Sequence, residues 1–308
     1  MFLSLCITLV FLCYIILKVN WSVFYSLILD INISFLVLGV MVYIGNYILR
    51  AVRLKVLLQN KNIKVINLLG INFIHNFYNR ILPARLGDFT LIYLLKKYSK
   101  ESINSSVNIF ILIKIYDLLI SMFLLAISYT VLYKINIIGW GIWLLTLLIL
   151  VLSLKPSSIL SLIQIVISKY TEWNYIDRFN SKLVSLIHDA KQLEINKIRL
   201  YLFLTSLGIW FLIAVLFYIL LLSINQNFGI WDTLFATTLA NFSWVLPING
   251  IGGFGTMEVS MAYAFSMRGH LFNEVLVSAL YINVIVFILS TLFVVIPYYM
   301  LLKRRTLT

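Results

Sequence analysis

The chain has 308 residues, of which 62% are hydrophobic and only 11% are charged, and its mean hydropathy is +1.01. Because a soluble domain of this size carries roughly a quarter charged residues, this composition excludes a soluble enzyme, a disordered tail and a secreted module held by disulfides. The net charge of +13 raises the question of a polyanionic partner, and the positions of the basic residues answer it.

Six apolar stretches are long enough to cross a hydrocarbon core of roughly 30 Å at about 1.5 Å per residue. They cover residues 2–17, 31–49, 107–133, 137–154, 200–223 and 275–302. The first stretch has no basic start and no small-residue cleavage site, so we expect a retained helix, with a cleaved signal peptide as the alternative.

Two further apolar regions are interrupted, and each divides into two short stretches. The first region consists of 65–82 and 86–95, and the second of 231–246 and 256–267. The predicted elbow residues are Pro83 and Gly87 in the first region, and Pro247, Gly252, Gly253 and Gly255 in the second. Each region predicts a re-entrant helix hairpin with a non-helical elbow, which is tolerated at membrane depth only inside protein or beside a wet cavity.

The basic residues predict an orientation with both termini in the cytoplasm. In that orientation the inner segments 50–64, 96–106 and 155–199 and the tail after 302 hold 18 of the 24 Lys and Arg residues. The outer loops hold three, which agrees with the positive-inside rule for a cell-membrane protein. Because these charges are dispersed over short loops, no nucleic-acid partner is expected. Segment 155–199 also predicts an amphipathic helix on the inner surface.

The order of elements repeats within one integral membrane domain, 1–308. Residues 1–133 and 137–302 each contain three crossings and one interrupted region. Because three is odd, the two halves are predicted to be inverted, an arrangement typical of transporters whose substrate site lies between paired broken helices. Two unrelated helix kinks are the alternative. The predicted fold is therefore an all-α polytopic membrane protein with six crossings and two re-entrant hairpins in inverted halves.

Two stripes of polar residues lie at helical spacing in the interrupted regions. They are Asn72, Asn76 and Asn79 in the first region, and Thr233, Thr237 and Asn241 in the second. Such faces line a cavity or form interhelical hydrogen bonds.

Ionisable residues inside membrane segments are rare and often functional. Lys114 and Asp117 are three residues apart in one crossing and are predicted to pair on one helix face, for binding or for packing. Asp88 and Glu258 follow the two elbows, where they bind a cationic group or a proton, or cap the restarted helix.

Arg80 and Arg85 flank the first elbow and have forked donors suited to phosphate, with snorkelling to the interface as the alternative. The three histidines are scattered without ligand spacing, so no metal or cofactor is predicted, and no catalytic motif is found. The predicted substrate-binding residues are Asn76, Asn79, Arg80, Arg85, Asp88, Lys114, Asp117, Asn241 and Glu258.

Four groups of residues occur in the order seen in the lysylphosphatidylglycerol synthase transmembrane (flippase-like) family, which the chain resembles over about residues 1–303. The groups are Arg50-x-x-Arg53, Asn79 with Leu82-Pro83-x-Arg85-x-Gly87-Asp88, Lys114-x-x-Asp117, and Pro247 with Gly252-Gly253-x-Gly255-x-x-Glu258. The resemblance implies a multi-helix membrane protein that translocates or handles lipids. Some members carry a soluble domain that transfers lysine from tRNA to phosphatidylglycerol.

The chain departs from the family pattern at three places. Asp88 stands where the family usually has Glu, Leu91 where it usually has Arg, and Ile113-Lys114 where it usually has an acidic–basic pair. The chain reaches Thr308 soon after the last crossing, so we expect no lysyl transfer and no enzymatic activity.

The expected function is that of a lipid flippase-like protein. Its expected partners are anionic or aminoacylated phospholipids or isoprenoid-linked lipids, and a synthase or transferase is a candidate partner protein. The alternatives are a membrane-embedded enzyme that modifies a lipid or glycolipid through Asp88 and Glu258, and a non-transporting subunit of an envelope-assembly complex.

Overall fold

The computed structural model describes residues 16–58, 62–82, 86–154, 161, 196–242 and 254–303. Every regular element within these ranges is a helix, so the predicted all-α membrane fold is confirmed. The helices are α2 (Trp21–Leu29), α3 (Ile33–Leu57), α4 (Val65–Ile81), α5 (Asp88–Ser99), α6 (Ile103–Tyr133), α7 (Ile137–Leu154), α10 (Asn196–Ser223), α11 (Ile230–Phe242), α12 (Thr256–Ser266) and α13 (Phe272–Lys303).

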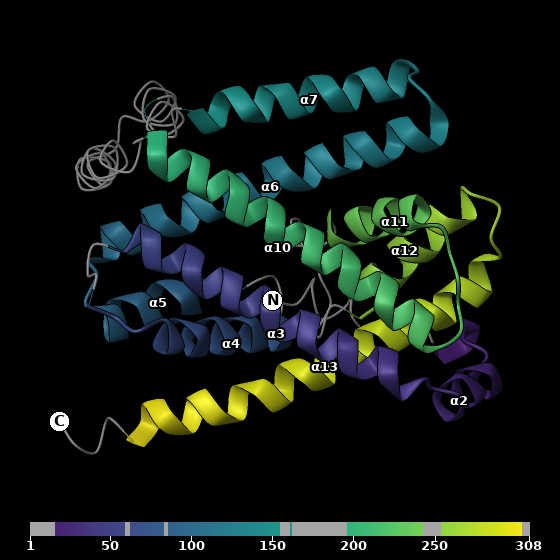
Figure 1. Ribbon diagram of the computed structural model, residues 1–308, viewed down its shortest axis with the longest axis horizontal. Coiled ribbons are helices and arrows are strands. Elements are labelled where there is room, and N and C mark those ends of the chain that lie inside the picture. The colour runs from purple at the N-terminus through teal and green to yellow at the C-terminus, as the bar shows by residue number, and fades with distance from the viewer. Residues whose placement is uncertain are drawn as a thin grey trace, which may run out of the picture.

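Five of these helices, α3, α6, α7, α10 and α13, are long and apolar enough to cross a membrane. They run roughly along the long axis of the molecule (Figure 1). The predicted crossing at 2–17 and the predicted amphipathic helix within 155–199 lie almost entirely outside the described residues. Five of the six predicted crossings therefore correspond to candidate spans, and the total of six stays a prediction.

Among the described helices, α3 and α10 make the most extensive contact, and they run antiparallel. The amide N–H of Asn32, just before α3, donates to the carbonyl of Ser223 at the end of α10 over 2.8 Å. Midway along the pair, the side-chain amide of Asn46 donates to the carbonyl of Ile209 over 2.7 Å. A buried amide that bonds across a helix pair fixes the register of the two helices.

Each of the two interrupted regions forms a pair of short helices, with bounds close to the predicted ones. Figure 1 places α4 and α5 towards one end of the long axis, and α11 and α12 towards the other. This arrangement is compatible with two re-entrant hairpins and with two inverted halves, and both stay predictions.

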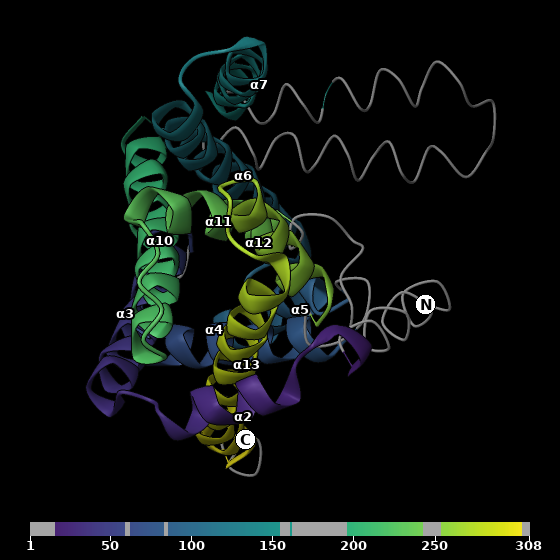
Figure 2. The ribbon, with the colours of Figure 1, turned by 90° about the vertical axis from the view of Figure 1, so that its right-hand side faces the viewer.

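Helix α7 lies at the edge of the bundle beside α6 (Figure 2). Its buried residues are the small ones, Gly139, Thr146 and Ser153, while its large apolar side chains face outwards. A helix that is apolar on its outer face suits contact with lipid chains. The structure also contains α2, which the sequence did not predict and which has no buried residue.

Helix α3 continues about two turns beyond the predicted end of its crossing at residue 49. Residues 50–57, predicted as part of an inner loop, are therefore helical, while their predicted location on the inner side stays a prediction. Arg53 is only 2% exposed and forms an ion pair with a distant helix. Because Asp117 compensates the charge of Arg53 inside the protein, this arginine can be buried on a helix.

Candidate functional site

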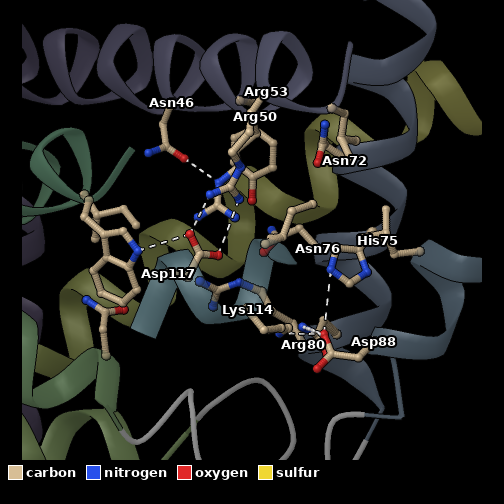
Figure 3. Close-up of a pocket in the computed structure, with 18 of the residues that line it drawn as sticks. Asn46, Arg50, Arg53, Asn72, His75, Asn76, Arg80, Asp88, Lys114 and Asp117 are labelled. Atoms are coloured by element: carbon tan, nitrogen blue, oxygen red, sulfur yellow. Dashed lines mark hydrogen bonds and ion pairs between the residues drawn. The ribbon is translucent and has the colours of Figure 1, made fainter. Parts of the chain in front are cut away.

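A cavity of about 520 Å³ lies between the short helices and the long ones. It receives residues from α3, α4, α5, α6, α10, α11, α12 and α13, and Figure 3 shows its polar side chains. Its charged or amide side chains and its histidine are Asn46, Arg50, Arg53, Asn72, His75, Asn76, Asn79, Arg80, Asp88, Lys114, Asp117 and Asn241. Its apolar residues include Leu54, Leu91, Phe110, Ile113, Leu118, Ile213, Leu216, Phe217 and Val286. The cavity is therefore amphipathic.

One wall of the cavity holds a buried ion pair between α3 and α6. A terminal nitrogen of Arg53, Nη1, lies 2.6 Å from the Oδ1 atom of Asp117, and Nη2 lies 3.4 Å from Oδ2 (Figure 3). The same Nη1 atom donates to Ser206 over 2.8 Å, and the indole of Trp210 donates to Asp117 over 3.4 Å. The two side chains are 3% and 17% exposed, so each charge depends on the other for its compensation.

A second ion pair lies where α5 begins. The Lys114 ammonium is 3.0 Å from the Oδ1 atom of Asp88, which also accepts a hydrogen bond of 3.0 Å from the side-chain amide of Asn79. The Nε2 atom of His75 lies 3.8 Å from the same oxygen. Asp88 is the first residue of α5, where a carboxylate interacts favourably with the helix dipole.

The predicted pairing of Lys114 with Asp117 is therefore wrong in detail. Lys114 pairs with Asp88 of α5, and Asp117 pairs with Arg53 of α3, although both residues lie on α6. Helical spacing of three residues allows contact, but a partner on a facing helix competes with it. The two cross-helix pairs tie α6 to the neighbouring helices around the cavity.

Glu258 stands at the start of α12 and is fully buried, outside the lining of the cavity. Its Oε2 atom accepts from the amide N–H of Gly255 over 2.7 Å, which is the capping arrangement that the sequence left open. Its Oε1 atom accepts from the side chain of Asn283 on α13 over 2.7 Å, and the Oδ1 atom of Asn283 accepts from Arg80 over 3.2 Å. This buried chain connects the end of α4 to the start of α12.

The remaining predicted residues have different positions. Asn76 and Asn241 line the cavity, and the Asn241 amide donates to the carbonyl of Thr237 over 2.8 Å. The elbow residues Pro83, Arg85, Pro247, Gly252 and Gly253 lie outside the described residues.

Among the described residues, no group of three His, Cys, Asp or Glu side chains lies close enough to hold a metal ion.

Comparison with known proteins shows the family of the chain. A family model described as "Lysylphosphatidylglycerol synthase TM region" matches residues 1–294. The chain belongs to this family. It is also 28% identical over 200 residues to the UPF0104 membrane protein MJ1078 of Methanocaldococcus jannaschii, a match that covers 62% of this chain and 80% of the relative. No solved structure matches the chain.

The predicted binding set lacked several cavity residues of this family member, among them Asn46, Arg50, Arg53, Asn72, His75 and Trp210. A signal for Arg50 was present, because Arg50 and Arg53 are three residues apart and lie on one face if the helix continues. Asn46 and Trp210 carry no such signal, since single polar residues in apolar helices usually serve packing.

Exchanging the hydrogen-bonding groups of Glu258 and Asn283 tests the buried chain. Glu258→Gln places an amide NH₂ against one of two N–H donors, so we expect a loss of about 1–3 kcal/mol in the free energy of unfolding. In the double variant with Asn283→Asp, the glutamine donates to the new carboxylate, which still accepts from Arg80. We expect this variant to recover most of the loss in a detergent unfolding titration. A double variant no more stable than the single one would contradict the assignment of the chain.

Proposed function

We propose that this protein is a lipid flippase-like membrane protein that moves or holds a phospholipid or a lipid-linked substrate in its cavity. The observation that carries the proposal is the chemistry of the cavity lining. Charged and amide side chains share one space with leucine, isoleucine and phenylalanine inside a bundle of candidate membrane spans. Such a lining matches a molecule with a polar head group and apolar chains.

The two pairs of short helices support movement of the substrate. Residues of α4, α5, α11 and α12 all contribute to the cavity, and the end of α4 is joined to the start of α12 through Asn283. Broken helices that meet at a substrate site are typical of alternating-access transporters. In the proposed cycle the two hairpins open the cavity in turn to the two sides of the cell membrane, with both termini in the cytoplasm.

A two-carboxylate reaction is not part of the proposal. The membrane-embedded enzyme that the sequence left as an alternative needs Asp88 and Glu258 in one site. Asp88 lines the cavity, whereas Glu258 is fully buried outside its lining and accepts hydrogen bonds at both oxygens. These positions favour a role in the cavity wall for Asp88 and a positioning role for Glu258.

Reconstitution into liposomes tests the proposed function. Vesicles containing the purified protein and a head-group-labelled lipid are expected to exchange that lipid between leaflets faster than empty vesicles. Anionic, aminoacylated and isoprenoid-linked lipids are assayed separately, and absence of exchange for all three would overturn the proposal. Asp88→Asn is expected to slow exchange. Asp30→Asn makes the same chemical change at an exposed position and is expected to leave exchange unaltered.

A further inference from the structure

The cavity contains more basic than acidic groups. Its lining includes Arg50, Arg53, Arg80 and Lys114, but only two carboxylates, Asp88 and Asp117. Arg53 pairs with Asp117, and Lys114 pairs with Asp88. Arg80 is joined through Asn283 to the buried Glu258. Arg50 is the basic residue of the lining to which these contacts assign no acidic partner.

Arg50 is held in place but not neutralised by the described part of the chain. Its Nε atom donates to the side-chain oxygen of Asn46 over 2.8 Å, and its guanidinium lies 5.7 Å from the ring centre of Tyr47. Among the described residues, no carboxylate lies within 4 Å of it, and its two terminal nitrogens make no hydrogen bond. The side chain is half-buried on α3, a candidate membrane span.

A guanidinium inside a membrane protein without a counter-ion is energetically costly. Here the bond from Nε to Asn46 fixes the plane of the group, and the terminal nitrogens are left for a ligand. A planar fork of N–H donors matches the oxygens of a phosphate, which it binds with two parallel hydrogen bonds. The carboxylate near Arg50, that of Asp117, is already paired with Arg53, so a phosphate supplies the negative charge that balances Arg50.

The carboxylates of the cavity do not offer an equivalent site for an ammonium group. Asp117 is 2.6 Å from Arg53, and Asp88 is 3.0 Å from Lys114, so each already has a basic partner from the protein. A cationic head group would have to displace one of these partners. An anionic head group finds Arg50 already oriented.

We propose that Arg50 is the phosphate-binding residue of the cavity and that the substrate is a lipid whose head group carries net negative charge. This inference rests on the proposed function for the lipid nature of the ligand. It separates the substrate from lipids whose head group carries net positive charge, such as an aminoacylated phosphatidylglycerol.

Lipid binding to the full chain in a non-ionic detergent, followed by native mass spectrometry, tests the charge preference. Phosphatidylglycerol, phosphatidylcholine and lysylphosphatidylglycerol are titrated separately. We expect the wild-type protein to bind phosphatidylglycerol about tenfold more tightly than the other two. All three lipids carry the phosphate, but only the other two bring a cationic group into a cavity with more basic than acidic side chains. Equal or tighter binding of lysylphosphatidylglycerol would overturn the inference, and this comparison needs no variant.

Variants assign the preference to Arg50. Arg50→Gln is expected to weaken phosphatidylglycerol binding about tenfold. Phosphatidylcholine is expected to lose less affinity, because it loses the same phosphate contact but its choline cation is also relieved of a repulsive charge. Arg50→Lys keeps the charge without the fork, and we expect an intermediate affinity. Lys96→Gln removes one positive charge from an exposed position on α5 and is expected to have no effect. A preference that survives Arg50→Gln would refute the role of this residue.

Two further experiments distinguish a lipid phosphate from a soluble phosphate as the ligand, and distinguish failure of the anionic site from failure of transport. Inorganic phosphate added to the lipid complex is expected not to displace phosphatidylglycerol, and complete displacement would indicate a site for a soluble anion instead. Leaflet exchange is measured on the same preparations. Selective binding without exchange would refute transport and leave the anionic site intact. Exchange without charge preference would refute the anionic site and leave transport intact.

Discussion

Asp117→Ala is expected to lower the free energy of unfolding by about 3–5 kcal/mol, because it leaves Arg53 buried without a counter-ion. The side chain of Arg53 is 3% exposed, and its remaining partner is the hydroxyl of Ser206 at 2.8 Å, which provides no compensating charge. The substitution also removes an acceptor from Trp210. The effect is measured by titrating the purified protein with sodium dodecyl sulfate and following tryptophan fluorescence.

Two further variants show whether the loss arises from the buried charge. Removing both charges with Arg53→Met and Asp117→Leu is expected to restore much of the stability, since replacing a buried pair by apolar residues is often neutral. The pair of Arg268 with Asp232, also at 2.6 Å, is more exposed, at 32% and 19%. Asp232→Ala is therefore expected to cost at most about 1 kcal/mol. Equal losses for the two aspartate variants would contradict this account.

The sequence predicted the elements of the fold well because the interruptions of its apolar stretches are chemically clear. The predicted stretch 137–154 coincides with α7, and the predicted 256–267 differs from α12 (Thr256–Ser266) by one residue. Proline, glycine and runs of polar residues mark helix ends through local interactions, which can be read without knowledge of the fold.

The candidate site was predictable only in part, because its contacts join residues distant in sequence. Lys114 and Asp88 are 26 residues apart, and Arg53 and Asp117 are 64 apart. Local spacing suggested the nearer pair on α6, and nothing in the sequence shows which helix faces it. The interpretation of Arg50 and Arg53 as loop residues failed for the same reason, since basic residues after an apolar stretch usually lie at the membrane interface.

The close contact between α4 and α5 depends on Gly87, one of the predicted elbow residues. A Cβ atom built on Gly87 would lie 2.3 Å from the backbone N and Cα atoms of Asn79 and 2.6 Å from the carbonyl carbon of Tyr78. These are backbone atoms of α4, which cannot move away as the end of a flexible side chain can. The contact also places Asp88, the next residue, beside the side chain of Asn79.

Gly87→Ala is therefore expected to force α5 away from α4 and to lower the free energy of unfolding by at least about 1–3 kcal/mol, the usual cost of overpacking. Because Asp88 moves with the start of α5, its contacts with Asn79 and Lys114 lengthen, and binding at the cavity weakens along with stability. The matched control is Gly45→Ala on α3, where an added Cβ meets nothing within 4 Å. That variant is expected to be neutral or slightly stabilising, since alanine favours the helix over glycine. The same detergent titration measures both variants, and a Gly87→Ala protein as stable as the Gly45→Ala protein would show that α4 and α5 do not approach as closely as described.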